Sequence, residues 1–167
     1  DQARNVVAFA DLAEHDNISN TTVVSPSGAL SIPYNNTNTL YNTLNQQFTG
    51  ARDISTVNQA LGGTFVNGTE YEEVESARLL DASEYTVNTK LGYISLKTQL
   101  QADEVLAVAY NYIYSDGKNY QVGEFSTDNP SSAASCLYVK LLKGITMSPD
   151  MPFWDLMMKN IYSLGAY

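Results

Sequence analysis

The segment over residues 102–125 constrains the fold most strongly, because its sequence is that of one long β-hairpin. Asp116-Gly117 lies at its centre, and Asp-Gly is a favoured pair for the central positions of a type I′ turn, which joins antiparallel strands. A two-residue loop here would place Tyr110 opposite Gly123, where the tyrosine ring would cover bare backbone. The sequence therefore predicts antiparallel β-structure around this turn.

The register of this hairpin decides which side chains face the core. The predicted pairs are Ser115 with Lys118, Ile113 with Tyr120, Tyr112 with Gln121, Tyr110 with Gly123 and Val108 with Phe125. The predicted core face contains Leu106, Val108, Tyr110, Tyr112 and Phe125. Ala109, Asn111 and Glu124 are expected on the opposite face. A longer loop through Lys118 and Asn119 would change the register, and a slip of one residue would exchange the two faces.

Short helices are expected on either side of the β-rich centre. The apolar stripes with helical spacing are Leu40-Leu44-Phe48, Ile54-Val57-Leu61 and Trp154-Met157-Met158-Ile161. Asp53 is a plausible N-cap for the second helix and Gly62-Gly63 its end, while Asp150 is a plausible N-cap for the third. Gly50 interrupts the first stripe. These stripes are interpreted as core-facing.

The remaining apolar and alternating runs indicate strands. They are RNVVAFADL (residues 4–12), ARLLDASEYTV (77–87), LGYISLKTQL (91–100) and LYVKLL (137–142). The sequence therefore predicts an α+β fold, mainly antiparallel β, with a sandwich-like sheet, hairpins and two or three short helices. Length favours one soluble domain over residues 1–167. Because the chain starts at Asp1 and stops inside an ordered-looking pattern, we expect it to be excised from a much larger protein.

Charge and composition limit the partners. The formal net charge of −9 argues against binding to nucleic acid or to an anionic membrane surface. No stretch approaches the roughly 20 apolar residues of a transmembrane helix. Charged residues make up only 16% of a chain that is rich in Asn, Thr, Ser and Tyr, a balance more typical of envelope and surface β-proteins than of cytoplasmic enzymes.

Few residues offer catalytic or metal-binding chemistry. Cys136 is the only cysteine, so it forms no internal disulfide, and we expect it to be buried. His15 is the only histidine and has no serine-bearing turn to serve, which argues against a Ser-His-Asp enzyme and a His/Cys metal site. An acidic run contains Glu70, Glu72, Glu73 and Glu75. It lacks the spacing of a calcium loop and is interpreted as a solvated strand or turn edge. We therefore predict no catalytic, metal or cofactor site and no cofactor.

Five segments carry a further signal. In order they are RNVVAFADLAE (4–14), ESARLLDASEYTVNTKLGYISLKTQLQADEVLAVAYNYIY (75–114), YQVGEFS (120–126), LLKG (141–144) and WDLMMKNIYSLGAY (154–167). Together they cover about half of the chain, and their order and spacing resemble the SprA/Sov family, giant outer-membrane proteins of the type IX secretion system associated with gliding motility. The last segment is the most specific of the five.

The resemblance implies a function. The family is expected to form a very large β-barrel through which folded cargo passes from the periplasm to the cell surface, together with accessory envelope proteins. This chain would then be a non-enzymatic structural or interaction domain, periplasmic or exposed at the cell surface. Its expected partners are the remainder of the parent barrel and accessory secretion-system proteins, at partner-binding residues that the sequence does not identify.

Two alternatives rest on the residues themselves. A cell-surface, adhesin-like β-domain that binds glycan or protein would need Tyr112 and Tyr114 exposed for sugar stacking, although the stripe Tyr110, Tyr112 and Tyr114 is interpreted as core. An enzyme would need two of the acidic residues to share a cleft. We rank the translocon domain first, the binding module second and the enzyme third.

Overall fold

The computed structural model describes residues 3–15, 38–113, 117–129, 134–146, 148–150 and 154. The elements follow one another along the chain as β1 (Arg4–Phe9), α1 (Leu40–Gln47), the 3-10 helix η1 (Thr49–Arg52), α2 (Val57–Leu61), β2 (Tyr71–Ala77), β3 (Tyr85–Asn88), β4 (Tyr93–Leu96), β5 (Leu106–Val108), β6 (Tyr110–Ile113), β7 (Asn119–Val122) and β8 (Cys136–Lys143). The predicted α+β class, rich in β-structure with short helices, is confirmed.

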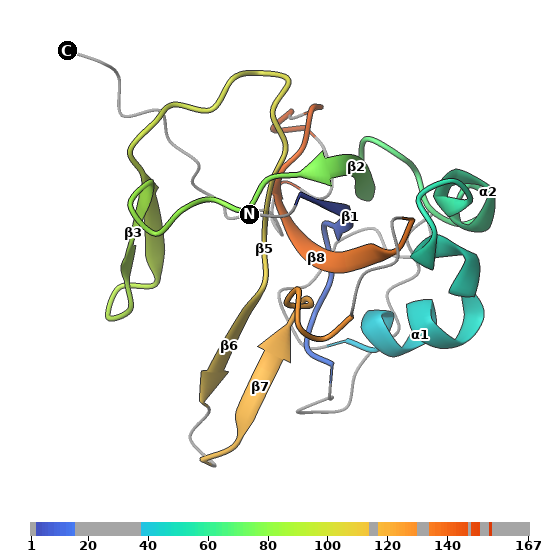
Figure 1. The fold of residues 1–167 in the computed structure, drawn as a ribbon, viewed down its shortest axis with the longest axis horizontal. Helices are drawn as coiled ribbons and strands as arrows, with labels where there is room; N and C mark the ends of the chain where they lie inside the picture. Colours follow the sequence, from blue (N-terminus) through green and yellow to red (C-terminus); the bar gives the residue numbers. More distant parts are fainter. Residues whose placement is uncertain are drawn as a thin grey trace.

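One four-stranded sheet forms the centre of the molecule, with the strand order β2-β1-β8-β5. The β1–β2 and β5–β8 pairs are antiparallel, whereas β1 and β8 run parallel (Figure 1). β1 and β8 occupy the central positions because their side chains are apolar and buried on both faces of the sheet. The two runs predicted as strands at residues 4–12 and 137–142 are therefore confirmed, the first of them inside the sheet as expected.

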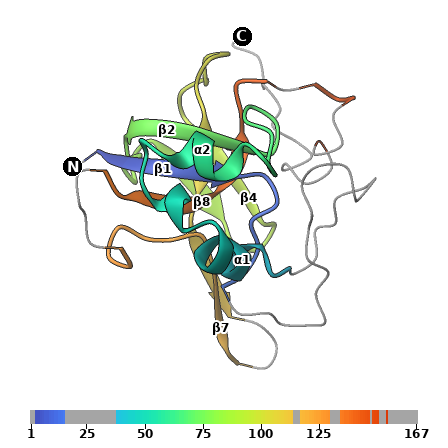
Figure 2. The same cartoon turned by 90° about the vertical axis from the view of Figure 1, so that its right-hand side faces the viewer.

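The two faces of this sheet are packed differently. Helices α1 and α2 cover one face, as Figure 2 shows. The core on that face contains Val7, Phe9, Leu12, Leu40, Leu44, Ala51, Val57, Leu61, Phe65, Tyr71, Cys136 and Tyr138. On the other face a smaller cluster contains Val6, Ala8, Ala10, Leu137, Val139 and Leu141, with Val105, Ala107 and Ala109 among the residues packed against it. The alternation of β1 and β8 supplies both clusters.

The first two predicted helices are confirmed, with one change at the start of α2. Leu40 and Leu44 are buried on α1, and Gly62 is the C-cap of α2. Asp53 does not cap α2, however. Its carboxylate instead accepts hydrogen bonds from the Ser55 backbone N–H at 2.9 Å and the Ser55 hydroxyl at 2.6 Å, so a turn precedes the helix. The helix predicted after Asp150 lies outside the described residues, apart from position 154.

The predicted hairpin at residues 102–125 exists, but its register is wrong by one residue. Tyr110 pairs with Val122 and Tyr112 pairs with Tyr120, and the last pair is Ile113 with Asn119. Five residues therefore separate the last paired residues of the two strands, whereas the predicted loop has two. In this register Tyr120 and Val122 share a face with Tyr110 and Tyr112, and Tyr110 is 41% exposed instead of buried.

The predicted first strand of this hairpin is in fact two strands, β5 and β6, which belong to different sheets. Leu106 and Val108 belong to β5 and pair with β8, while β6 pairs with β7. Ala109 lies at this change and approaches Gly123, where an added Cβ would lie 3.1 Å from the Ala109 Cβ. Gly123 has a φ of +74°, a backbone conformation that favours glycine. Ala109, not Tyr110, therefore covers this glycine.

Two hairpins extend away from the central sheet. Among the described residues, β3 pairs with β4 and β6 pairs with β7, each pair as a separate two-stranded sheet (Figure 1). The β3–β4 hairpin confirms the turn predicted between the runs at residues 77–87 and 91–100. Its pairing runs from Tyr85 with Leu96 to Asn88 with Tyr93.

Candidate functional site

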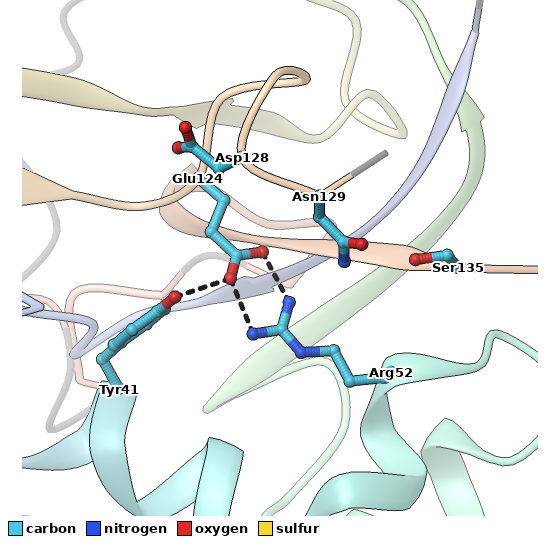
Figure 3. A pocket seen from close by; sticks show the side chains of 6 residues that line it. All are labelled: Tyr41, Arg52, Glu124, Asp128, Asn129 and Ser135. Atoms are coloured by element: carbon cyan, nitrogen blue, oxygen red, sulfur yellow. Dashed lines mark hydrogen bonds and ion pairs between the residues drawn. The ribbon is translucent and has the colours of Figure 1, made fainter. Parts of the chain in front are cut away.

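A buried carboxylate joins the helices to the sheet. Glu124, in the loop after β7, is only 4% exposed. Its Oε1 accepts hydrogen bonds from the Tyr41 hydroxyl at 2.8 Å and from Arg52 Nη2 at 2.6 Å. Its Oε2 accepts from Arg52 Nη1 at 2.6 Å and from the Tyr138 backbone N–H at 2.9 Å. Figure 3 shows Tyr41 and Arg52 pointing at this carboxylate from separate helices. We call Tyr41, Arg52, Glu124 and Tyr138 the Glu124 latch.

The guanidinium of Arg52 is committed to internal contacts. Besides Glu124, its Nη1 donates to the Cys136 carbonyl at 3.4 Å and its Nη2 donates to Asn45 Oδ1. Its central carbon lies 3.7 Å from the centroid of the Tyr138 ring, a cation–π contact. The four N–H groups on Nη1 and Nη2 thus have acceptors within the fold. The latch therefore holds structure together and leaves Arg52 poorly placed to bind an anionic ligand.

A surface pocket of about 390 Å³ borders the Glu124 latch. It is lined by Tyr41, Arg52, Glu124, Asp128, Asn129 and Ser135. The ring of His15 stacks on Tyr41, with centroids 3.7 Å apart and planes 4° apart. Asp128 accepts hydrogen bonds from the Phe125 backbone N–H and from the Gln121 amide. The charged groups around this pocket are therefore occupied in fixing the loop after β7.

A second group of polar side chains ties the end of β1 to the β6–β7 hairpin. The Tyr112 hydroxyl donates to Glu14 Oε1 at 2.7 Å, and the His15 backbone N–H donates to the Gln121 carbonyl at 3.0 Å. Tyr112 also lies between Tyr110 and Tyr120, with ring centroids 6.3 and 5.8 Å away. The Glu14 carboxylate therefore holds the central ring of this row of three tyrosines next to the end of β1.

Asp11 is the most perturbed carboxyl near this anchor. It is almost fully buried, and its Oδ2 has no hydrogen-bond partner among the described residues. Burial raises the pKa of Asp11 to about 7, although attraction to Lys140 opposes the rise. Burial likewise lowers the pKa of Lys140, against the attraction of Asp11 and Glu14. Asp11 is therefore expected to change its charge near neutral pH.

Replacing Asp11 with asparagine should flatten the pH dependence of stability. The pKa of Asp11 lies above its ordinary value of 3.8 in the folded state, so its stabilising contribution is complete below about pH 3.8 and is lost as the pH rises to about 7. Over this range the wild type should lose up to about 1.4 kcal/mol per pH unit relative to Asp11→Asn. Urea unfolding of both proteins between pH 4 and pH 8 measures this difference. If the stability of the wild type and of Asp11→Asn changed with pH in the same way, the raised pKa of Asp11 would be contradicted.

The acidic run is only partly solvated. Glu73 is half-buried and Glu75 exposed, but Glu70 and Glu72 are buried, so the predicted solvated edge is wrong for these two. Glu70 Oε2 accepts from the Val66 backbone N–H at 2.6 Å, and Glu72 Oε1 accepts from the Ile145 backbone N–H at 2.8 Å. Each carboxylate accepts a hydrogen bond from a backbone N–H group in a loop, and a local sequence pattern does not reveal such a partner. The described residues contain no cluster of His, Cys, Asp and Glu side chains that could hold a metal ion.

The other sequence predictions have mixed outcomes. Cys136 is fully buried, as expected, and burial raises the pKa of its thiol to about 12. The interpretation of the tyrosine stripe as core is wrong for Tyr110, while Tyr112 is half-buried and Tyr114 lies outside the described residues. Neither Arg52 nor Tyr41 was singled out from the sequence, because nothing in the local pattern marks them as partners of Glu124.

No protein-family model matches this chain, and no curated protein matches it. None of the helices in the described ranges is long and apolar enough to cross a lipid bilayer.

Proposed function

We propose that this chain is a non-enzymatic structural and interaction domain of an outer-membrane type IX protein-secretion translocon linked to gliding motility. One observation carries the interaction role: large apolar side chains are exposed on and around the two projecting hairpins. They are Leu79, Val87, Leu91, Tyr93, Tyr110 and Ile113. Apolar side chains that are exposed on projecting elements are available for contact with another protein.

The segments that resemble the SprA/Sov family support this proposal through their positions. Residues 4–14 include β1 and the anchor carboxylates Asp11 and Glu14, and residues 75–114 include β3 to β6. Residues 120–126 contribute Glu124 of the latch. The resembling segments thus contain β1, the end of β8, the whole β3–β4 hairpin and most of the β6–β7 hairpin.

The hydrogen bonds of the buried charged groups favour a role in protein–protein contact over a role in catalysis. Arg52 and Glu124 bind each other, and Glu14 accepts from Tyr112. A catalytic acid, base or nucleophile must be able to reach a substrate. These groups are instead committed to holding the hairpins and helices on the sheet.

The proposed partners are the remainder of the parent outer-membrane barrel and accessory secretion-system proteins. The domain would lie on the periplasmic side or at the cell surface, as an insertion that buttresses, caps or recruits. Its net charge of −9 opposes a nucleic-acid partner.

An adhesin-like domain that binds glycan is the second candidate. The exposure of Tyr110 favours it, since an exposed ring can stack on a sugar. Tyr120 is only 8% exposed, and Tyr112 is half-buried with its hydroxyl bound to Glu14. Two of the three rings in the row therefore offer little surface to a sugar, which ranks this function below the first.

Deleting the segment that encodes residues 1–167 from the full-length parent tests the proposed function. We expect secreted cargo to fail to reach the cell surface while the parent still inserts in the membrane. Glu75→Gln in the same parent is the control, because Glu75 is exposed and lies outside both projecting hairpins. Normal cargo delivery after the deletion would reject a role in translocation.

A further inference from the structure

We infer that the β3–β4 hairpin is a docking arm that seats its apolar face in an apolar groove of another protein, rimmed by carboxylates. The docking arm is defined as residues 85–97. The inference rests on the proposed function, because it takes the domain to act by contact, and it adds the surface and the chemistry of the partner.

The docking arm has one apolar face and one mixed face of polar side chains and Tyr93. The paired side chains of Tyr85 with Leu96 and Val87 with Ile94 share one face. The pairs Thr86 with Ser95 and Asn88 with Tyr93 lie on the opposite face, where Tyr93 is the one aromatic side chain. Such alternation is typical of a sheet with one face packed on a core.

The apolar face of the docking arm is not part of either core. None of its four apolar side chains belongs to the two buried clusters in the described part of the chain; Val87 is 54% exposed, and Tyr85, Ile94 and Leu96 are half-buried. A lone two-stranded hairpin is at best marginally stable in water. An alternating hairpin that stands away from its own core therefore indicates a packing surface supplied by another molecule.

Hydrogen bonds fix the base of the docking arm. Glu84 Oε2 accepts from Arg78 Nη1 at 2.6 Å and from the Asp81 backbone N–H at 2.7 Å. The Lys97 backbone N–H donates to the Glu84 carbonyl at 2.9 Å, which closes the pair of strands. The base of the docking arm is therefore ordered before any partner binds.

The tip of the docking arm is ordered as well. Asn88 Oδ1 accepts from the backbone N–H groups of Lys90 at 3.1 Å and Leu91 at 3.0 Å. Gly92, with a φ of +69°, donates its N–H to the Asn88 carbonyl at 2.8 Å. Leu91 is held at this loop with 74% of its surface exposed. A preformed loop loses less conformational entropy on binding, which suits a docking element.

Charge identifies the kind of partner. The docking arm contains Lys90 and Lys97 and no acidic residue, whereas the whole chain has a net charge of −9. The arm is thus a basic, apolar extension of an acidic domain. Carboxylates at the rim of the groove would complement the two lysines. An anionic membrane would also attract the lysines, but it would repel the acidic body of the domain, so a protein groove is the better match.

Site-specific photocrosslinking of the full-length parent in cells tests the docking arm. A photoreactive amino acid is placed at Val87 or Ile94, on the apolar face, and at Thr86 or Ser95 as the matched control on the other face. We expect Val87 and Ile94 to crosslink to one protein segment rich in apolar residues and flanked by Asp or Glu, and Thr86 and Ser95 to give no such product. Reversing both charges with Lys90→Glu and Lys97→Glu should abolish the Val87 product.

Three results would overturn the docking arm. They are the absence of a protein crosslink from Val87 and Ile94, equal crosslinking from both faces, and crosslinks to lipid alone. Failure of the docking arm is distinguishable from failure of the proposed function. If the crosslink is absent but deletion of residues 1–167 still stops cargo delivery, the arm fails and the function stands. If the crosslink forms but deletion leaves delivery normal, the function fails.

Discussion

Replacing Glu124 with glutamine should lower the free energy of unfolding by about 3 kcal/mol, the lower end of the range for breaking a buried ion pair. The amide keeps the shape of the side chain but removes the charge that compensates Arg52. Arg52 is 26% exposed, so water can solvate part of the freed guanidinium, which places the cost at the lower end. Urea denaturation of residues 1–167, followed by far-ultraviolet circular dichroism, measures the loss.

Glu84→Gln is the control for this prediction, because it removes a carboxylate from an exposed pair with an N–O distance of the same 2.6 Å. Arg78 is 63% exposed, and such surface pairs are worth about 0–1 kcal/mol. Arg52→Met in the Glu124→Gln background should cost much less than Arg52→Met alone, since the ion pair is already broken. Equal losses from Glu124→Gln and Glu84→Gln would contradict a structural role for the Glu124 latch.

Phe9→Ala should be at least as damaging, with a loss of about 3–5 kcal/mol. Phe9 is fully buried on the central strand β1, and its ring contacts the rings of Phe65, Tyr71 and Tyr138 at centroid distances of 5.9, 6.0 and 5.6 Å. Since a whole domain is stable by only about 5–15 kcal/mol, we expect this variant to be partly unfolded at 37 °C. Thermal denaturation by circular dichroism measures the effect.

Two further variants make the Phe9 prediction specific. Phe9→Leu keeps most of the buried volume and should cost less than about 1.5 kcal/mol. Ile113→Ala shortens a side chain that is exposed on β6 and should change stability by no more than about 0.5 kcal/mol. A loss below about 1 kcal/mol for Phe9→Ala would mean that the helix-covered face of the sheet is not the main core.

Local sequence patterns predicted the elements whose burial follows a simple period. The apolar run of β1 and β8 marks strands buried on both faces, and the spacing of Leu40 and Leu44 marks a helix with one buried face. In each case the nearest neighbours in the sequence decide which side chains meet the core. The same patterns could not reveal that β1 and β8 run parallel, because strand order depends on the path of the chain between them.

The hairpin register depended on loop length, which Asp116-Gly117 alone does not determine. A two-residue turn and the observed pairing of Ile113 with Asn119 are both compatible with a glycine at position 117, where φ is +77°. The difference of one residue placed Tyr120 and Val122, in place of Gln121 and Gly123, opposite Tyr112 and Tyr110. Register is therefore a property of the packed molecule, in which Ala109 and Gly123 must fit together.

The buried carboxylates could not be predicted for a related reason. Glu124 meets Arg52 across 72 positions of sequence, and Glu72 meets the Ile145 backbone N–H across 73. A buried charge is acceptable only where its partners are supplied, and here they come from distant segments. Sequence alone leaves such glutamates looking like surface residues.

Cargo delivery by point variants of the docking arm tests the central claim most directly, namely that this domain serves secretion through contact with another protein. The full-length parent carries Val87→Ser and Ile94→Ser, and the matched control carries Thr86→Ala and Ser95→Ala on the opposite face. The account predicts that the first pair abolishes surface delivery of cargo while the parent still inserts in the membrane, and that the control pair leaves delivery normal. Normal delivery by the Val87 and Ile94 variant, at the same level of inserted parent, would contradict it.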